Sequence, residues 1–381
     1  MIDDALVIDA VAHAPNFTND NCVNRSAHEL IALVKQLHLQ WNPPGYRLDE
    51  EQFLVDVDVE TVARTLFLES ATDMTVHHHL PLYSWFHDGN VSQEKNVELA
   101  KRYPQRVISY AGVDPTTGPK ACIESLERQL EDLPSIVGLK FYPHQVEPWR
   151  TFRLDEEDRL FPLYARALEL GIKTIAVHKA SPLGPVPMNP YRVDDVEGAA
   201  YAFPNLNFEV IHSGLAFVDE TAQAIARFPN VYANLETTMQ LTYFGPGKFQ
   251  DVIAQLLFWG GKEKLLYSAS VPYGHPRPQI EALWDLQLSD DLLEKYNIEQ
   301  LTIDDKKAIL GGNYARMIGL DVEAARVAIA DDEFSQELRA RDGELHAPWS
   351  NWREGYAAGR FPRYETPADV PAFGSGAVVA P

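Results

Sequence analysis

Cysteine is scarce in this chain, which has Cys22 and Cys122 among its 381 residues. Two cysteines are too few for a disulfide scaffold or a zinc-thiolate cluster, and they fit a reducing cytoplasm. Long apolar runs are also missing, since no uninterrupted apolar stretch would span a bilayer. The acidic first residues enter an apolar run at once, unlike the basic and then apolar start of a signal peptide. We therefore expect a cytoplasmic protein.

Basic residues are outnumbered by acidic ones. Lys and Arg total 33 whereas Asp and Glu total 55, which gives a formal net charge of -22. A surface with this charge repels nucleic acid and anionic membranes, so we expect neither as a partner. Hydrophobic residues make up 45% of the chain, enough for the core of a soluble globular protein. The length allows two domains or one large barrel with extensions.

Two short apolar runs each lead into a histidine. Residues 174–177 precede His178, and residues 207–211 precede His212. Runs rich in β-branched residues between turn residues indicate strands buried on both faces. If these are parallel strands joined by a helical crossover, both histidines lie at the strand ends that carry the chemistry in barrels of alternating strands and helices. Two core histidines held by hydrogen bonds are the alternative explanation.

Similar runs recur along the chain, mostly alternating with helix-like segments, and predict a (β/α)8 TIM barrel over residues 1–330. The expected strands are 5–10, 64–68, 107–115, 136–143, 174–178, 207–214, 231–236 and 265–270. Residues 331–381 turn polar, and from residue 347 onwards aromatic residues lie among prolines and glycines without a helical period. This pattern predicts an irregular C-terminal extension that packs on the barrel or on a partner subunit.

Further polar residues lie at or near expected strand ends. His13 follows the first strand, and Lys140 lies inside the fourth, where an ammonium group must be paired, neutral or used in chemistry. His77, His78 and His79 follow the strand expected at 64–68. Adjacent side chains cannot all face one way, so at most two of these histidines would reach one site. A loop of surface histidines is the alternative explanation. Glu69, Asp114 and Glu236 also lie near expected strand ends.

An ordered set of motifs between about Leu6 and Leu320 resembles the amidohydrolase-related family, in the branch that includes aminocarboxymuconate semialdehyde decarboxylase and the resorcylate and dihydroxybenzoate decarboxylases. The set is specific as a series, although no single motif is. The motifs are Ile8-Asp9, residues 110–115, Gly138-Leu139-Lys140, His178, His212-Ser213-Gly214, residues 265–272 and residues 311–316.

The resemblance implies a metal site in the barrel mouth. The expected protein ligands are a His-x-His pair on strand one, a histidine on strand five and an aspartate on strand eight, while a strand-six histidine serves the chemistry or a second metal. Members with two metals bridge them with a carboxylate, sometimes a carboxylated lysine from strand four. This chain departs from the pattern twice, because Val11 replaces the first histidine of the pair and Ser270 replaces the aspartate. Neither is a useful ligand for a divalent ion at neutral pH.

The remaining residues are expected to hold one divalent metal. His13, His178 and His212 are the predicted ligands, with zinc the first choice and iron or manganese as alternatives. His212 and Lys140 are the predicted catalytic residues, and Lys140 serves as a bridging ligand if carboxylated or as an anchor for a substrate carboxylate if not. One residue of the triple-histidine segment would fill a vacated ligand position.

Three functions follow from this partly lost ligand set. The first is a partner subunit of a hetero-oligomeric metalloenzyme, reminiscent of the two-subunit 2-aminoisobutyrate hydroxylase, beside a homologous catalytic subunit. The second is a self-sufficient decarboxylase or hydrolase with one metal, acting on a small carboxylic or amino acid, alone or self-associated. The third is a metal-free scaffold or small-molecule binder, because fold does not fix function.

Overall fold

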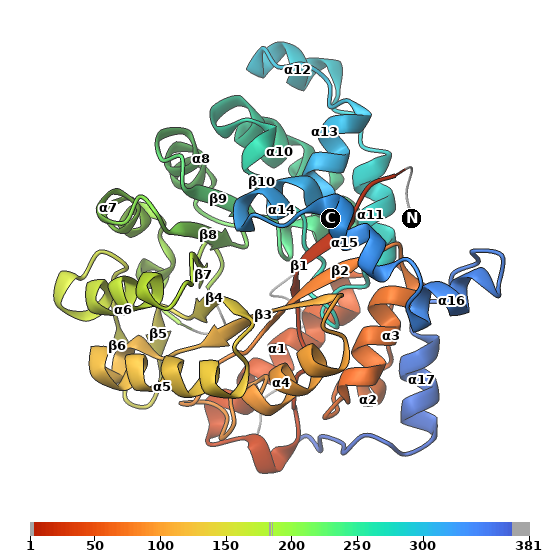
Figure 1. Cartoon of the computed structure of the whole chain (residues 1–381), viewed down its shortest axis with the longest axis horizontal. Coiled ribbons are helices and arrows are strands. Elements are labelled where there is room, and N and C mark those ends of the chain that lie inside the picture. Colours follow the sequence, from red (N-terminus) through yellow and green to blue (C-terminus); the bar gives the residue numbers. More distant parts are fainter. Residues whose placement is uncertain (1–3, 183, 185, 368–381) are drawn as a thin grey trace.

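A parallel eight-stranded sheet forms the centre of the molecule in this computed structural model, which describes residues 4–182, 184 and 186–367 (Figure 1). Each neighbouring pair in the order β1-β2-β3-β4-β7-β8-β9-β10 is parallel. The strands are β1 (Ile8–Ala12), β2 (Met74–His78), β3 (Val107–Gly112), β4 (Ile136–Phe141), β7 (Thr174–His178), β8 (Asn207–Ile211), β9 (Val231–Asn234) and β10 (Leu265–Leu266).

Hydrogen bonds between β1 and the segment after β10 close the sheet into a barrel. Ala10 N donates to Tyr267 O over 3.1 Å, and Ser270 N donates to Val11 O over 3.0 Å. A parallel bridge joins Ala12 to Val271. The predicted (β/α)8 barrel is therefore confirmed, and closure brings the carboxyl ends of all eight strands around one mouth.

Helices surround the sheet, and several begin at a capping side chain. Asp58 accepts a hydrogen bond from Thr61 N, and Ser92 accepts one from Lys95 N, as expected for N-cap residues. The helices up to β10 are α1 (Arg25–Trp41), α2 (Glu50–Phe53), α3 (Val59–Glu69), α4 (Gln93–Arg102), α5 (Pro119–Asp132), α6 (Glu157–Glu169), α7 (Asp194–Ala202), α8 (Val218–Arg227), α9 (Leu241–Phe244) and α10 (Pro246–Gly260). A short hairpin, β5 (His144–Gln145) and β6 (Arg150–Thr151), follows β4.

After β10 the chain is helical. These elements are α11 (Pro276–Trp284), α12 (Asp290–Tyr296), α13 (Ile303–Lys307), the π-helical turn η6 (Ala308–Gly312), α14 (Asn313–Ile318), α15 (Val322–Ile329), α16 (Glu333–Arg339) and α17 (Ser350–Ala357). None of the helices in the described ranges is both long and apolar enough to cross a membrane.

The second strand was predicted in the wrong place. Residues 64–68 belong to α3, which begins after the N-cap residue Asp58 and is buried around most of its surface. The actual second strand, β2, contains His77 and His78. An apolar run of five residues does not distinguish a buried strand from a buried helical face, and histidines within a strand resemble a polar loop in sequence.

The C-terminal extension is more regular than predicted, because residues 333–339 form α16 and residues 350–357 form α17. Figure 1 shows α17 beside α3, on the outside of the barrel. Trp349 and Trp352 are fully buried there. The Glu69 carboxylate, at the end of α3, accepts hydrogen bonds from the backbone N–H groups of Trp349 and Asn351 and so caps α17. The described part of the extension therefore packs on its own barrel; residues 368–381 lie outside the described ranges.

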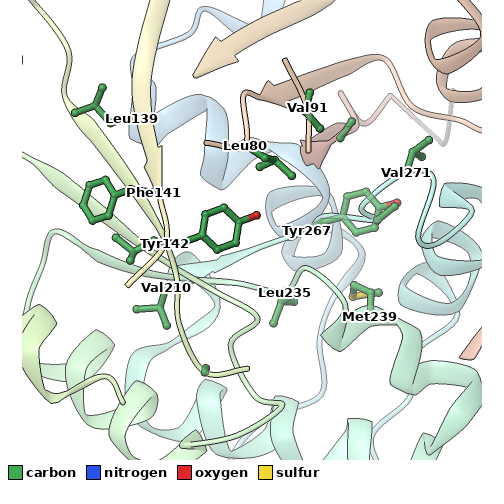
Figure 2. Packing of buried hydrophobic residues seen from close by; sticks show 14 of the residues in the cluster. Leu80, Val91, Leu139, Phe141, Tyr142, Val210, Leu235, Met239, Tyr267 and Val271 are labelled. Carbon is green, nitrogen blue, oxygen red and sulfur yellow. The ribbon is translucent and has the colours of Figure 1, made fainter. Parts of the chain in front are cut away.

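Consecutive residues at the end of β4 serve two layers of the fold. Figure 2 shows the rings of Phe141 and Tyr142 on opposite sides of the chain. Phe141 packs against Phe152, with ring centroids 5.9 Å apart, in the layer under the helices. Tyr142 points the other way and lines the barrel mouth. This alternation along a strand separates the core from the mouth.

The closing helical segment contacts β1 through a glycine. A Cβ atom at Gly311 would lie 2.0 Å from Leu6 O and 2.9 Å from Ile8 N, both backbone atoms that cannot move aside cheaply. At the adjacent Gly312, the nearest atom to a Cβ would be 3.7 Å away. Two adjacent glycines therefore differ sharply in how much side chain they tolerate.

We predict that Gly311→Ala lowers the free energy of unfolding by at least about 2 kcal/mol, because the methyl group forces the closing segment away from β1. Gly312→Ala is the matched control and is expected to be neutral or stabilising by up to about 1 kcal/mol, since alanine favours helix over glycine. Urea unfolding of both variants measures the difference. Equal midpoints for the two variants would contradict this packing.

Candidate metal centre in the barrel mouth

A small cavity of about 90 Å³ lies at the carboxyl ends of the strands. Apolar side chains from α1, Leu30, Leu33, Val34 and Leu37, line it, and polar groups from the strand ends also face it. His38 anchors this helix, because its ring contacts Pro272 O over 3.1 Å and Leu48 N over 2.8 Å. Helix α1 therefore lies against the mouth and restricts the space to a ligand of a few heavy atoms.

His178 and His212 meet in this mouth, as their places after two apolar runs predicted. His178 Nδ1 lies 3.1 Å from His212 Nε2, from the ends of neighbouring strands β7 and β8. The other nitrogen of each ring contacts a backbone carbonyl oxygen: His178 Nε2 lies 2.9 Å from Ser181 O, and His212 Nδ1 lies 3.3 Å from Glu236 O.

The two carbonyl contacts select one tautomer of each ring. A carbonyl oxygen only accepts, so both contacts are satisfied when His178 Nε2 and His212 Nδ1 carry the hydrogen. A neutral imidazole has one N–H group, and in these tautomers the two nitrogens that face each other at 3.1 Å both present lone pairs. Burial lowers the pKa of His178 well below its ordinary value and that of His212 to about 4, which disfavours a shared proton. The pair fits a cation between the rings, since metal-binding histidines commonly donate their outer N–H to a carbonyl group.

Glu236, two residues after β9, is the carboxylate of the mouth. Its Oε1 accepts a hydrogen bond from Ser270 Oγ over 2.6 Å and faces His13 Nε2 at 3.4 Å. Its Oε2 lies 3.7 Å from His212 Nε2 and accepts no hydrogen bond within the described residues, although it is buried. Burial opposes ionisation of Glu236, but the imidazoles of His212 and His13 and the Lys140 ammonium outweigh burial and hold its pKa well below the usual range.

Lys140 is buried near two carboxylates. Burial lowers its pKa to about 8, while Glu236 and Glu209 act in the opposite direction, so the ammonium form prevails at pH 7. The Lys140 Nζ atom lies 5.3 Å from the centroid of the Tyr142 ring. Tyr142 lines the cavity and Lys140 does not. The Lys140 ammonium group therefore lies beside the cavity and influences the mouth through its charge, without lining the cavity.

Three residues that follow successive strands have left-handed backbone conformations. The φ angles are 66° at His212, 60° at Thr237 and 62° at Ser270. Such conformations in residues other than glycine cost about 1–3 kcal/mol each and cluster at functional sites. The rim of this mouth is therefore strained where β8, β9 and β10 end, next to the candidate metal centre.

The predicted ligand His13 reaches this cluster through Glu236. His13 Nε2 faces the Glu236 carboxylate at 3.4 Å, and the buried His13 Nδ1 has no hydrogen-bond partner in the described part of the chain. Val11, at the other strand-one position, is buried and offers no donor atom. Ser270 uses its hydroxyl on Glu236. The structure thus brings His178 and His212 together and keeps His13 on the opposite oxygen of Glu236.

The triple-histidine segment does not supply a replacement ligand to this pair. His77 Nδ1 contacts Asn96 of α4 at 3.0 Å, and His79 Nδ1 contacts Gln129 of α5 at 3.0 Å, so both face the surrounding helices. His78 faces the barrel interior, where its ring stacks on Tyr110 and its Nε2 bonds to Ala10 O at 3.1 Å.

The donor set is incomplete for a metal ion as it stands. In the part of the chain that the structure describes, no group of three or more His, Cys, Asp or Glu side chains is arranged to hold a metal ion. Two imidazole lone pairs are in place, and the free Glu236 Oε2 is the nearest anionic donor. The residues present therefore offer two imidazole nitrogens, and a third donor must move toward them before they can hold a divalent ion.

The model of the family described as amidohydrolase matches residues 8–320, which is most of the chain. The chain belongs to the amidohydrolase family. This match confirms the resemblance seen in the motifs between about Leu6 and Leu320. No curated protein sequence matches this amidohydrolase.

Solved structures share the fold of this amidohydrolase. An uncharacterised TIM-barrel protein from Bordetella bronchiseptica is 18% identical over 82% of this chain and 98% of its own, with a TM-score of 0.57. A 5-carboxyvanillate decarboxylase from Novosphingobium aromaticivorans, solved with bound manganese, is 15% identical over 83% and 98%, with a TM-score of 0.54. A probable 2-pyrone-4,6-dicarboxylic acid hydrolase from Acinetobacter baumannii is 12% identical over 83% and 100%, with a TM-score of 0.50. At these identities the likeness shows the fold alone.

His38 secures α1 in its neutral form. Its Nδ1–H donates to Pro272 O and its Nε2 accepts from Leu48 N, so a second ring proton would break the contact with Leu48. Burial lowers its pKa from 6.5 to about 4. The unfolded chain therefore binds this proton at higher pH than the folded chain does, and the stability contributed falls as pH drops from 6.5 to about 4.

We predict that His38→Gln makes the free energy of unfolding less dependent on pH in this window. The number of protons taken up on unfolding should fall by up to about one. Across the whole window, the contribution of His38 to the free energy of unfolding changes by on the order of 3 kcal/mol. Urea unfolding at several pH values measures the slope, with His87→Gln at an exposed position as the matched control. An identical slope for His38→Gln and the native chain would contradict the neutral, hydrogen-bonded imidazole.

Proposed function

We propose that this amidohydrolase binds one divalent ion between His178 and His212 and serves as a partner subunit of a hetero-oligomeric metal-dependent enzyme. One observation carries the ion site: two buried imidazole nitrogens face each other at 3.1 Å while the outer nitrogen of each ring lies within hydrogen-bond distance of a carbonyl oxygen. Zinc is the expected metal, with iron or manganese as alternatives, because imidazole ligands suit all three.

When bound, such an ion would polarise a ligand and lower the pKa of a nearby water. The chain's own residues set the surroundings. His178 and His212 are oriented by Ser181 O and Glu236 O, and α1 restricts water at the mouth. Glu236 stays ionised because its pKa is held low, and no donor of the described residues occupies its Oε2.

The partner role is supported by what the mouth lacks. Val11 has no donor atom, and the Ser270 hydroxyl is used on Glu236. Lys140, the predicted anchor for a substrate carboxylate, does not line the cavity. We infer that a homologous barrel with the complete ligand set carries the main reaction, with hydroxylation of a small carboxylic or amino acid as the class expected of such a pair.

A self-sufficient decarboxylase or hydrolase of a small carboxylic acid is the second candidate. Its specific support is the small cavity of about 90 Å³, which combines an apolar wall from α1 with His178, His212 and Glu236. The similar barrels named a decarboxylase and a hydrolase agree with this class. His212 would act as the base, and Lys140 would hold the carboxylate only if it reached the cavity.

We predict about one divalent ion per chain in natively purified protein, measured by elemental analysis. His178→Ala should lose this ion because it removes one of the two facing lone pairs. His87→Ala, at an exposed histidine, should keep it. A native chain that is metal-free, takes up no added zinc, iron or manganese, and melts at the same temperature after chelation would contradict the ion site and favour a binding barrel.

Mass spectrometry of co-eluting chains, together with turnover assays on small carboxylic acids, distinguishes the two candidates. The partner hypothesis predicts a stoichiometric second barrel with intact ligands and negligible turnover by this chain alone, even with metal supplied. Ordinary turnover by a homo-oligomer that His178→Ala abolishes would establish the self-sufficient enzyme instead. Turnover unchanged by His178→Ala would exclude an essential role for the ion.

A further inference from the structure

We propose that Glu236 supplies the anionic third donor of the single-ion site and that Ser270 is the positioning residue that aims it. This inference rests on the proposed ion between His178 and His212. It assigns to the end of β9 a ligand role that the expected ligand pattern does not contain. It also gives Ser270, at a position where a carboxylate was expected, a function of its own.

The two oxygens of the Glu236 carboxylate have different surroundings. Oε1 receives the Ser270 hydroxyl at 2.6 Å and faces His13 Nε2 at 3.4 Å. Oε2 is buried, accepts no hydrogen bond within the described ranges, and lies 3.7 Å from His212 Nε2. One oxygen is therefore held in place by donors, and the other is free beside the lone pair of His212.

An unsatisfied carboxylate oxygen is costly in a buried site. A cation beside His212 would satisfy it, together with the two imidazole lone pairs. Lys140 influences Glu236 by charge, but the ion pairs of Glu236 in the described part of the chain are with His13 and His212. Glu236 Oε2 is therefore available to bind the proposed cation.

The position of Ser270 is fixed by its backbone. Its N–H donates to Val11 O over 3.0 Å, where β1 meets the segment after β10, and its φ of 62° turns the chain. The hydroxyl is thereby held against Glu236 Oε1. A carboxylate carried at residue 270 would extend toward the place that the Glu236 carboxylate now occupies.

The test measures metal affinity of the full-length chain after chelation, with Zn²⁺ followed by calorimetry and Co²⁺ by its visible absorption. Glu236→Gln is expected to weaken binding by at least about 100-fold and to shift the Co²⁺ spectrum, because it removes the anionic donor. Ser270→Ala should weaken binding by about tenfold, in line with the loss of an orienting hydrogen bond.

Matched controls separate donation from general disturbance. Glu209→Gln changes a buried carboxylate of β8 that bonds to Tyr110 and Asn234, and Ser268→Ala removes a buried hydroxyl that bonds to Asn234. Both should retain the native affinity. The double variant Ser270→Asp with Glu236→Ser moves the carboxylate across the mouth, and it should recover affinity to within about tenfold of the native chain if position and charge are what matter.

The outcomes distinguish this inference from the proposed function. If the native chain binds neither ion, the single-ion site itself is wrong. If the native chain binds, His178→Ala does not, and Glu236→Gln binds as tightly as the native chain, then the ion site stands and the role of Glu236 is refuted. Should Glu236→Gln fail to fold, as judged by circular dichroism, unchanged affinity in Ser270→Ala or no binding by the folded double variant would refute the inference.

Discussion

Burying the Glu236 carboxylate in the barrel mouth would cost several kcal/mol without compensation, so the surrounding chain must supply donors and positive charge. Those groups come from widely separated parts of the sequence: His13 follows β1, His212 follows β8 and Ser270 follows β10. They meet only because the sheet closes between β1 and the segment after β10. The donors around the carboxylate thus depend on barrel closure, and their arrangement leaves one carboxylate oxygen free.

Closure also explains the strain at the rim. Three residues after successive strands have left-handed backbones, and two of them, His212 and Ser270, carry side chains of the candidate metal centre. A barrel core buried on both faces can offset a few kcal/mol of such strain. Helix α1 then covers the mouth, so the facing imidazoles lie in a small and largely apolar enclosure. In that low-dielectric setting two opposed lone pairs are unfavourable without a cation.

Sequence patterns predicted the features that depend on local order along the chain. The apolar runs before His178 and His212 placed both residues at strand ends, and the structure brings the two rings together. The same logic failed for the second strand, because an apolar face of α3 and a buried strand look alike over five residues. The helix over residues 350–357 was missed since its stability comes from burying Trp352 and from its cap by Glu69, which are contacts distant in sequence.

Glu236 could not be ranked from sequence for a related reason. It lay near an expected strand end, as Glu69 and Asp114 did, but its importance comes from Ser270 across the closed barrel. Glu69 instead caps a C-terminal helix, and Asp114 caps the turn after β3. The sequence signal for Glu236 was indirect. Ser270 stands where the resemblance implied an aspartate, so one carboxylate is missing from the mouth. Glu236 lies near the same mouth and can replace that negative charge.

The central claim is that the opposed lone pairs of His178 and His212 bind a cation. A crystal structure of the natively purified chain, with anomalous diffraction recorded at the absorption edge of the metal it contains, tests this most directly. The account predicts one anomalous peak between His178 Nδ1 and His212 Nε2, with Glu236 Oε2 turned toward it. A peak bound to His13 without these two nitrogens, or no peak together with a proton shared between the rings, would contradict it.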